Sequence, residues 1–224
     1  MIGRRLVRGI LLACLAVLPL WAAAIVSNGS FESASGAAQP PGAYVRCYAD
    51  GTCTFLNPRP AGSIDYWVIS GEIDYIGTHW IAADGNRSLD LNGDAATGGV
   101  SQVISTLPGR QYEVSFYLAG NPDGGVGVSP VKNLTVEAAG HSQNFTFDTT
   151  GRTRASMGWV EQTWLFTATG SSTALVFRTT DHSSYGPALD NVGVVELTIP
   201  EPGSLALLGA GLLLVAGLRL RRKR

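Results

Sequence analysis

The sequence predicts an all-β domain, a sandwich of two antiparallel sheets, carried between two apolar terminal segments. Short runs of alternating apolar and polar residues fill the middle of the 224-residue chain, without a sustained helical period. Turn-forming Gly, Asn, Asp and Pro residues separate these runs. About ten short strands with this spacing are typical of two antiparallel sheets packed face to face.

The N-terminal segment has the layout of a secretory signal peptide. Three arginines within the first eight residues precede an apolar run over residues 9–20, and Ala22-Ala23-Ala24 supplies small residues for cleavage. We therefore expect a signal peptide over residues 1–24 and a mature chain that begins at Ile25.

Two cysteines, Cys47 and Cys53, remain after that cleavage, with a short polar stretch between them. An even number of cysteines in an exported chain is typical of disulfide bonding, so we predict a disulfide between these two. A zinc site is the alternative. It is disfavoured because no histidine lies nearby at zinc-finger spacing.

The region between the terminal segments, residues 25–198, is long enough for one domain with a full core. Half of the sixteen Lys and Arg residues lie in the two ends, so this region has eight cations against sixteen Asp and Glu residues, a net charge of −8. Phosphate backbones repel such a domain, and we expect no nucleic-acid partner.

The clearest strand covers residues 111–118, where Tyr112, Val114, Phe116 and Leu118 share one face. Turn chemistry at Pro108-Gly109 precedes it. Further strands are expected at residues 64–69, 87–91, 100–105, 132–138, 144–147, 160–168, 173–178 and 189–197.

The C-terminal segment, residues 199–224, joins Pro200-Glu201-Pro202, an apolar run over residues 205–218 and a basic end. The prolines prevent a regular helix just before the apolar run, which has about the length of a short membrane-spanning helix. The terminal cations would stay on the cytoplasmic side of the inner membrane.

This order of features resembles the PEP-CTERM sorting signal of Gram-negative bacteria that make exopolysaccharides. The resemblance implies a membrane protease-transpeptidase partner, an exosortase, that cuts near Pro200-Glu201-Pro202. The alternative is an ordinary C-terminal membrane anchor with an incidental Pro-Glu-Pro.

A series of short motifs in the central region carries a second resemblance. These motifs are residues 28–32, 64–67, 85–93, 99–102 and 186–192. Their order resembles galactose-binding-like jelly rolls, as in many carbohydrate-binding modules and in a family of plant cell-wall proteins of unknown function. Together with the loop 119–125 and the sorting tail, the series is similar to bacterial choice-of-anchor C proteins.

The jelly-roll resemblance also implies a structural calcium site. In such domains the opening and closing strands often lie side by side and a calcium ion commonly bridges them, here through Glu32 and Asp190. Calcium prefers six to eight oxygen ligands, which two carboxylates and loop carbonyls can supply. The alternative is that both carboxylates accept hydrogen bonds from turn amides.

A carbohydrate site needs an exposed aromatic ring flanked by amides or carboxylates. Trp80 lies outside any clean alternation and close to Asp84 and Asn86, and Tyr185 lies in a loop. We predict these four residues as the ligand site, with a core position as the alternative for the aromatic rings. We interpret the loop 121–125 as a plain surface connection rather than as a third site at Asp123.

Catalytic motifs are absent from the sequence. The three histidines have no metal-ligand spacing, and no Gly-X-Ser-X-Gly turn occurs. We expect a non-enzymatic protein, exported through a transient inner-membrane anchor to the cell surface or extracellular matrix, where it binds exopolysaccharide or a cell-envelope glycan. The alternatives are a structural matrix or adhesion protein in a biofilm, acting through protein contacts, and a glycosidase or lyase with unmarked acids.

Overall fold

The structure is a computed structural model of the chain. It describes residues 25–36, 42–54, 62–94, 97–124, 127–197, 209–211 and 213. The predicted signal peptide, the Pro200-Glu201-Pro202 motif and most of the predicted membrane helix lie outside these residues. Within the described part of the chain, no helix has the length and apolar character needed to cross a membrane.

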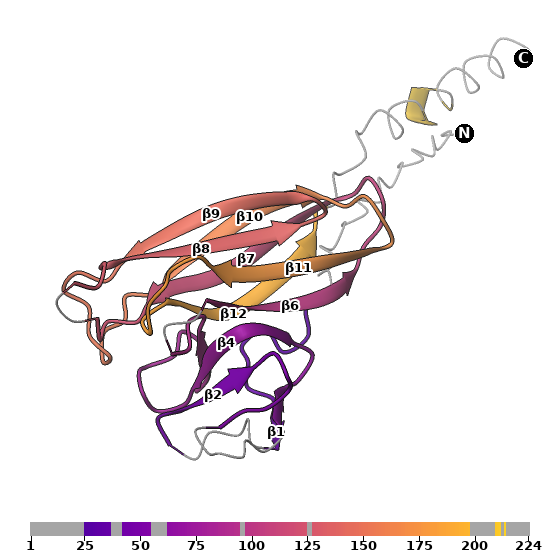
Figure 1. Cartoon of the computed structure of the whole chain (residues 1–224). Coiled ribbons are helices and arrows are strands. Elements are labelled where there is room, and N and C mark those ends of the chain that lie inside the picture. The colour runs from indigo at the N-terminus through magenta and orange to yellow at the C-terminus, as the bar shows by residue number, and fades with distance from the viewer. Residues whose placement is uncertain are drawn as a thin grey trace, which may run out of the picture.

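Strands make up almost all of the regular structure that is described. They are β1 (Ala34–Gly36), β2 (Tyr44–Tyr48), β3 (Gly62–Ile64), β4 (Val68–Ile76), β5 (Ser88–Asp90), β6 (Gly98–Ser105), β7 (Gln111–Gly120), β8 (Val131–Ala138), β9 (His141–Asp148), β10 (Val160–Thr167), β11 (Ser172–Thr179) and β12 (Pro187–Glu196). Figure 1 shows the long strands β6 to β12 in the upper part of the domain, with β1, β2 and β4 below them.

All described strand pairs are antiparallel, in the order β10-β7-β12-β5-β4-β6-β11-β8-β9, with β2 beside β4 and with β1 paired to β3. Strand β4 connects the two layers of the sandwich. Its residues 74–76 pair with β5, in the layer that also contains β10, β7 and β12, and its residues 68–71 pair with β6, in the layer that also contains β11, β8 and β9. Gly71 has a φ of 64°, and a Cβ there would lie 2.1 Å from the carbonyl oxygen of Thr97. Only glycine fits this crossing between the layers.

The core lies between the two layers. Phe116 of β7 packs its ring 5.3 Å from Phe177 of β11 and 5.1 Å from Phe145 of β9. The predicted inner face of β7 is buried at all four positions. The predicted all-β fold, an antiparallel jelly-roll sandwich, is therefore confirmed.

Two local predictions differ from the structure. Residues 64–69 do not form one strand, because β3 ends at Ile64 and a turn with Tyr66 at a φ of 71° precedes β4. Strand β9 begins at His141, three residues before the predicted start, because it pairs with β8 from Ala138 onward.

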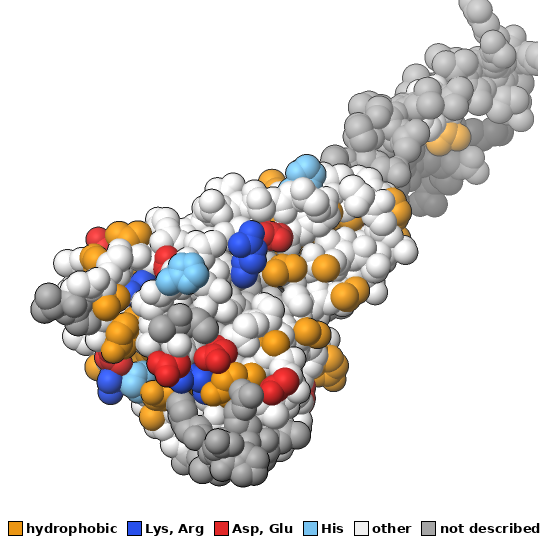
Figure 2. All heavy atoms as spheres, in the orientation of Figure 1, with side chains coloured by type: hydrophobic (Ala, Val, Ile, Leu, Met, Phe, Trp, Pro, Cys, Tyr) orange, Lys and Arg blue, Asp and Glu red, His pale blue; other side chains and the backbone are white. Residues whose placement is uncertain are grey.

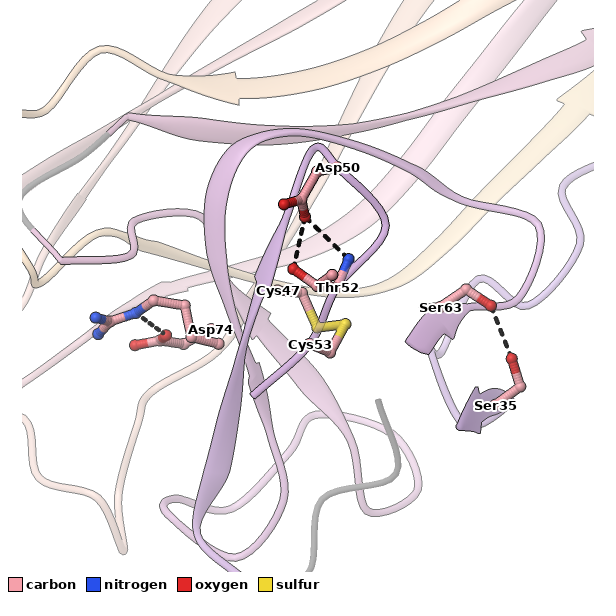
Figure 3. The surroundings of a disulfide bond; sticks show 8 residues. Ser35, Cys47, Asp50, Thr52, Cys53, Ser63 and Asp74 are labelled. Atoms are coloured by element: carbon pink, nitrogen blue, oxygen red, sulfur yellow. Dashed lines mark hydrogen bonds and ion pairs between the residues drawn. A yellow bond between two sulfur atoms is a disulfide. The ribbon is translucent and has the colours of Figure 1, made fainter. Parts of the chain in front are cut away.

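The predicted disulfide is confirmed. Figure 3 shows the Cys47–Cys53 bond closing the turn that follows β2, with both cysteines buried. Inside this turn, the Asp50 side chain accepts hydrogen bonds from the backbone N–H of Thr52 at 3.1 Å and from its hydroxyl at 2.6 Å. Because the two sulfurs bond to each other, the alternative of a zinc site is set aside.

Candidate functional site

A row of polar residues crosses one end of the sheet. Arg46 of β2 stands opposite Asp74 of β4, and Asp74 stands opposite Asp90 of β5. Asp90 then faces Ala188 of β12, which faces Ala119 of β7. Directly opposed residues share one face of a sheet, so three charged side chains gather beside two small ones.

Arg46 and Asp74 of this row line a pocket of about 540 Å³, which we call the polar pocket. Its charged lining residues are Arg46, Asp74, Asp94, Asp123 and Arg154. Tyr44, His79, Asn121 and Tyr185 are among its uncharged lining residues. Figure 2 shows acidic and basic side chains close together on the lower part of the domain, where Figure 1 places β2 and β4.

Arg46 links two carboxylates on one side of the polar pocket. Its Nε donates to Asp74 Oδ1 at 3.0 Å, and its Nη1 lies 3.6 Å from Asp94 Oδ2. Burial raises the pKa of Asp74 to about 6, although the hydrogen bond from Arg46 favours the charged form. The side chain of Asp94 is largely exposed, at 77%.

Asp123 forms a second charged cluster on the other side. Arg154 donates to its carboxylate from Nε at 2.8 Å and from Nη2 at 2.7 Å, and His79 Nε2 lies 2.8 Å from Asp123 Oδ2. Partial burial alone would raise the pKa of Asp123, but the hydrogen bonds from Arg154 and His79 outweigh it and lower the pKa. The loop 121–125 was interpreted as a plain connection, and the structure instead places Asp123 in the pocket wall.

Asp90 is fully buried and holds two neighbouring segments in place. Its Oδ2 accepts from Asn121 Nδ2 at 2.8 Å, and its Oδ1 accepts from the backbone N–H groups of Gly186 and Asn92 at 3.0 Å each. Burial raises the pKa of this carboxyl to about 7. Asp90 therefore positions Asn121 and the loop that carries Tyr185.

A second pocket, of about 750 Å³, shares His79 and Arg154 with the polar pocket and is also lined by Trp80 and Asn86. Trp80 is not the exposed ring that was expected, since it is only 4% exposed. Its indole N–H donates to Ser88 Oγ at 2.8 Å, which fixes it against the core. Asp84 is exposed and lines neither pocket.

Glu32 and Asp190 bind the same loop, residues 83–87, which we call the clamped loop. Glu32 Oε1 accepts from the backbone N–H groups of Asn86 and Arg87 at 2.7 Å each. Asp190 Oδ2 accepts from those of Ala83 at 2.8 Å and Asp84 at 2.9 Å. Burial raises the pKa of Asp190 to about 7, although its amide donors favour the carboxylate.

These contacts are the hydrogen bonds to turn amides that the sequence left open as the alternative to calcium. Among the residues that the structure describes, no three or more His, Cys, Asp or Glu side chains gather where they could hold a metal ion. Because amide donors already face the carboxylates of Glu32 and Asp190, this donor set does not fit a calcium site.

Sequence reasoning proposed Tyr185, weighed Asp123 but favoured a surface connection for its loop, and did not consider Tyr44, Arg46, Asp74 or Arg154. One feature of the sequence could have indicated this site: Asp74 and Asp90 each lie in a strand, between two apolar neighbours. A buried acid in a strand needs hydrogen-bond partners, and such residues often mark a site.

Residues 24–195 match the family described as "Protein of unknown function (DUF642)", and residues 198–223 match the PEP-CTERM protein-sorting motif. The chain is also 30% identical over 180 residues to halomucin of Haloquadratum walsbyi. The alignment covers 79% of this chain but spans only about 2% of the length of halomucin.

Two solved structures are similar in outline. One is a family 35 carbohydrate binding module from Clostridium thermocellum, with 13% identity, a TM-score of 0.42 and coverage of 58% of this chain and 92% of that chain. The other is a CBM35 from Paenibacillus barcinonensis, with 18% identity, a TM-score of 0.41 and coverage of 58% and 93%. Similarity at this level carries no information about the ligand of this chain.

Proposed function

The chain belongs to the DUF642 family and carries a C-terminal PEP-CTERM sorting motif, and from this premise we propose that it is an exported protein that binds carbohydrate in the polar pocket. The sorting motif indicates export and processing at a membrane. Within the domain, the polar pocket is the feature that we assign to ligand binding, since the sequence contains no catalytic motif.

One observation carries the proposal: the polar pocket combines half-buried aromatic rings with fixed donors and acceptors. A sugar presents apolar C–H faces ringed by hydroxyl groups that both donate and accept hydrogen bonds. Tyr44 and Tyr185 offer ring surface, and the amide of Asn121 can donate and accept. The Tyr44 ring is held edge-on against His79 at a centroid distance of 5.1 Å.

The pocket walls are also held in place before any ligand arrives. Asp90 accepts hydrogen bonds from Asn121 and from the backbone of Gly186, and Arg154 donates hydrogen bonds to Asp123 from two of its nitrogens. Groups that are already ordered lose little conformational entropy on binding, which favours affinity for a weakly interacting ligand such as a sugar.

The state of Asp123, one of the three pocket carboxylates, favours binding rather than catalysis. Glycoside hydrolysis needs one carboxyl that donates a proton and a second that acts as nucleophile or base. Hydrogen bonds from Arg154 and His79 lower the pKa of Asp123 and tie up its oxygens. A carboxylate held in this way is a poor proton donor and a poor nucleophile.

The finer assignment follows from the resemblances. We place the protein with the choice-of-anchor C proteins, with an exosortase as its processing partner at Pro200-Glu201-Pro202. A transient anchor in the inner membrane would deliver the domain to the cell surface or biofilm matrix, where its ligand is an exopolysaccharide or envelope glycan. Asn86, in the second pocket, extends the site.

Protein contact is a second candidate function, favoured by exposed apolar side chains. Tyr66, Val68 and Val103 are 68%, 68% and 71% exposed. The pairing of Val68 with Ser101 on β6 places Val68 and Val103 on one face of the sheet. Tyr66, in the turn before β4, lines the same surface hollow as Val103. Apolar groups that are exposed together often mark an interface.

A glycan array probed with the full chain separates the two candidates. Tyr44→Ala and Tyr185→Ala should abolish glycan binding, whereas Tyr66→Ala, which removes a tyrosine that does not line the polar pocket, should leave it unchanged. A blank array together with self-association that Val103→Lys abolishes would favour the protein-contact function instead.

A further inference from the structure

Both arginines that line the polar pocket are already paired. Arg46 is bonded to Asp74 and lies near Asp94, and Arg154 is bonded to Asp123 through two nitrogens. The side chain of Arg46 is 13% exposed and that of Arg154 is 54% exposed. A guanidinium whose charge is balanced by a carboxylate attracts a further anion less strongly than an unpaired guanidinium does.

The formal charges of the lining residues give the same result. Two arginines face three aspartates, so the polar pocket has a net charge of −1 when His79 is neutral. The surrounding region, residues 25–198, has a net charge of −8. Both the pocket and the domain around it therefore oppose the approach of a polyanion.

The polar pocket still has hydrogen-bond donors that can bind the uncharged hydroxyl groups of a sugar. A guanidinium has five N–H groups, and Arg154 bonds Asp123 only through Nε and Nη2. The Nη1 of Arg154 can thus donate to a sugar hydroxyl while the charge of the guanidinium stays neutralised by Asp123. Asn121 and Tyr185 add further uncharged hydrogen-bonding groups.

We propose that the ligand of the polar pocket is an uncharged glycan, and that the arginine–aspartate pairs exclude acidic glycans that carry uronate groups. This inference rests on the proposed function and specifies its ligand class. A uronate carboxylate would lose its hydration in the pocket without gaining an unpaired cation, so it would bind more weakly than a neutral sugar of the same shape.

The test uses the full chain, purified in detergent, and isothermal titration calorimetry at low and high salt. The probes are neutral galactose, glucose and mannose oligomers, galacturonate and mannuronate oligomers, and glucosamine oligomers. We expect a neutral oligomer to bind at least about tenfold more tightly than any uronate oligomer. Its affinity should change less than about twofold with salt, because no net charge is paired on binding.

Asp123→Asn provides a gain-of-binding test. The substitution keeps the shape of the side chain but leaves the guanidinium of Arg154 without its carboxylate. Uronate affinity relative to neutral affinity should rise by at least about fivefold. Glu137→Gln is the matched control, since it releases Arg178 from an equivalent pair on β8 and β11, outside the polar pocket, and should change neither affinity.

A second variant, Asp94→Asn, covers the case in which Asp123→Asn does not fold. The side chain of Asp94 is largely exposed and lies near Arg46 Nη1, so its removal should preserve the fold and raise relative uronate affinity by a smaller factor.

The possible outcomes separate the two claims. Preferred binding of uronate or glucosamine oligomers that Tyr185→Ala abolishes would overturn the neutral-ligand inference and leave the proposed function standing. Failure of every oligomer to bind would overturn the proposed function itself. Neutral binding with no gain in uronate affinity for Asp123→Asn or Asp94→Asn over Glu137→Gln would overturn exclusion by charge pairing.

Discussion

Glu32 and Asp190 come from opposite ends of the domain sequence and accept hydrogen bonds from one loop, residues 83–87. These two carboxylates thereby accept hydrogen bonds from four backbone N–H groups of the clamped loop. The loop packs beside Trp80 and supplies part of the wall of the second pocket. Two carboxylates thus connect both ends of the domain to this loop through hydrogen bonds to turn amides, the alternative to the calcium site that the jelly-roll resemblance implies.

The first prediction concerns the strength of this clamp. Asp190→Ala removes the acceptor for the backbone N–H groups of Ala83, Asp84 and Asn191. Leaving these partly buried donors without their acceptor should lower the free energy of unfolding by about 1–3 kcal/mol, measured by urea denaturation. Asp84→Ala, in the same loop but exposed, should change it by less than about 0.5 kcal/mol. Equal effects of the two substitutions would argue against the clamp.

The second prediction concerns metal removal. Because amide groups occupy Glu32 and Asp190, EDTA should leave the melting temperature of the full chain unchanged, and added calcium should not raise it. Differential scanning calorimetry with and without chelator makes the measurement. A melting temperature that falls in EDTA and is restored by calcium would reinstate the calcium site implied by the family resemblance.

The third prediction concerns Gly186, beside the buried Asp90. A Cβ at this position would lie 2.2 Å from Asn92 Oδ1 and 2.6 Å from Asp90 Oδ1. Gly186→Ala should therefore lower the free energy of unfolding by about 1–3 kcal/mol and weaken glycan binding, because Tyr185 is its neighbour. Gly42→Ala is the control, since nothing lies within 4 Å of its added Cβ. Similar stability for both variants would mean that the hydrogen-bonded groups around Asp90 can move to accommodate the extra methyl group, which would contradict this prediction.

The fourth prediction concerns pH. Burial raises the pKa values of Asp74, Asp90 and Asp190 to about 6, about 7 and about 7 in the folded domain, from a usual value near 3.8. The folded state then binds more protons than the unfolded state between about pH 4 and pH 7. The free energy of unfolding should therefore be highest near pH 4 and fall as the pH rises to about 7.

Urea denaturation across this pH range tests the sign of the effect. Asp90→Asn cannot titrate at this position, so its stability should depend less steeply on pH than that of the unsubstituted chain. A free energy of unfolding that increases steadily from pH 4 to pH 7 would contradict the raised pKa values.

Local pattern predicted most of the fold. The alternation over residues 111–118 identified β7 because one face of that strand is buried along its whole length. Strand β2 was missed, since Cys47 and the polar stretch after it were interpreted as a loop. The turn at Tyr66 was missed because a positive φ at a tyrosine leaves no signal in the alternation of apolar residues.

The candidate site could be predicted only in part. Tyr185 was found because a loop aromatic is unusual. Arg46, Asp74 and Asp123 lie in separate segments. They meet because the sheet order places β2 beside β4, β4 beside β5, and β12 between β5 and β7, the strand that precedes Asp123. Strand order depends on contacts between distant residues, which periodicity does not report. Trp80 was mistaken for an exposed ring because its partner Ser88 comes from the next strand.

Sugar binding in the polar pocket can be located residue by residue with nuclear magnetic resonance of the full chain in detergent during titration with a neutral oligosaccharide. The account predicts saturable chemical-shift changes centred on the backbone and side-chain signals of Tyr44, Asn121 and Tyr185, with Tyr66 unchanged. Shifts centred on Tyr66 and Val103, or no saturable shift with any neutral oligosaccharide, would contradict it.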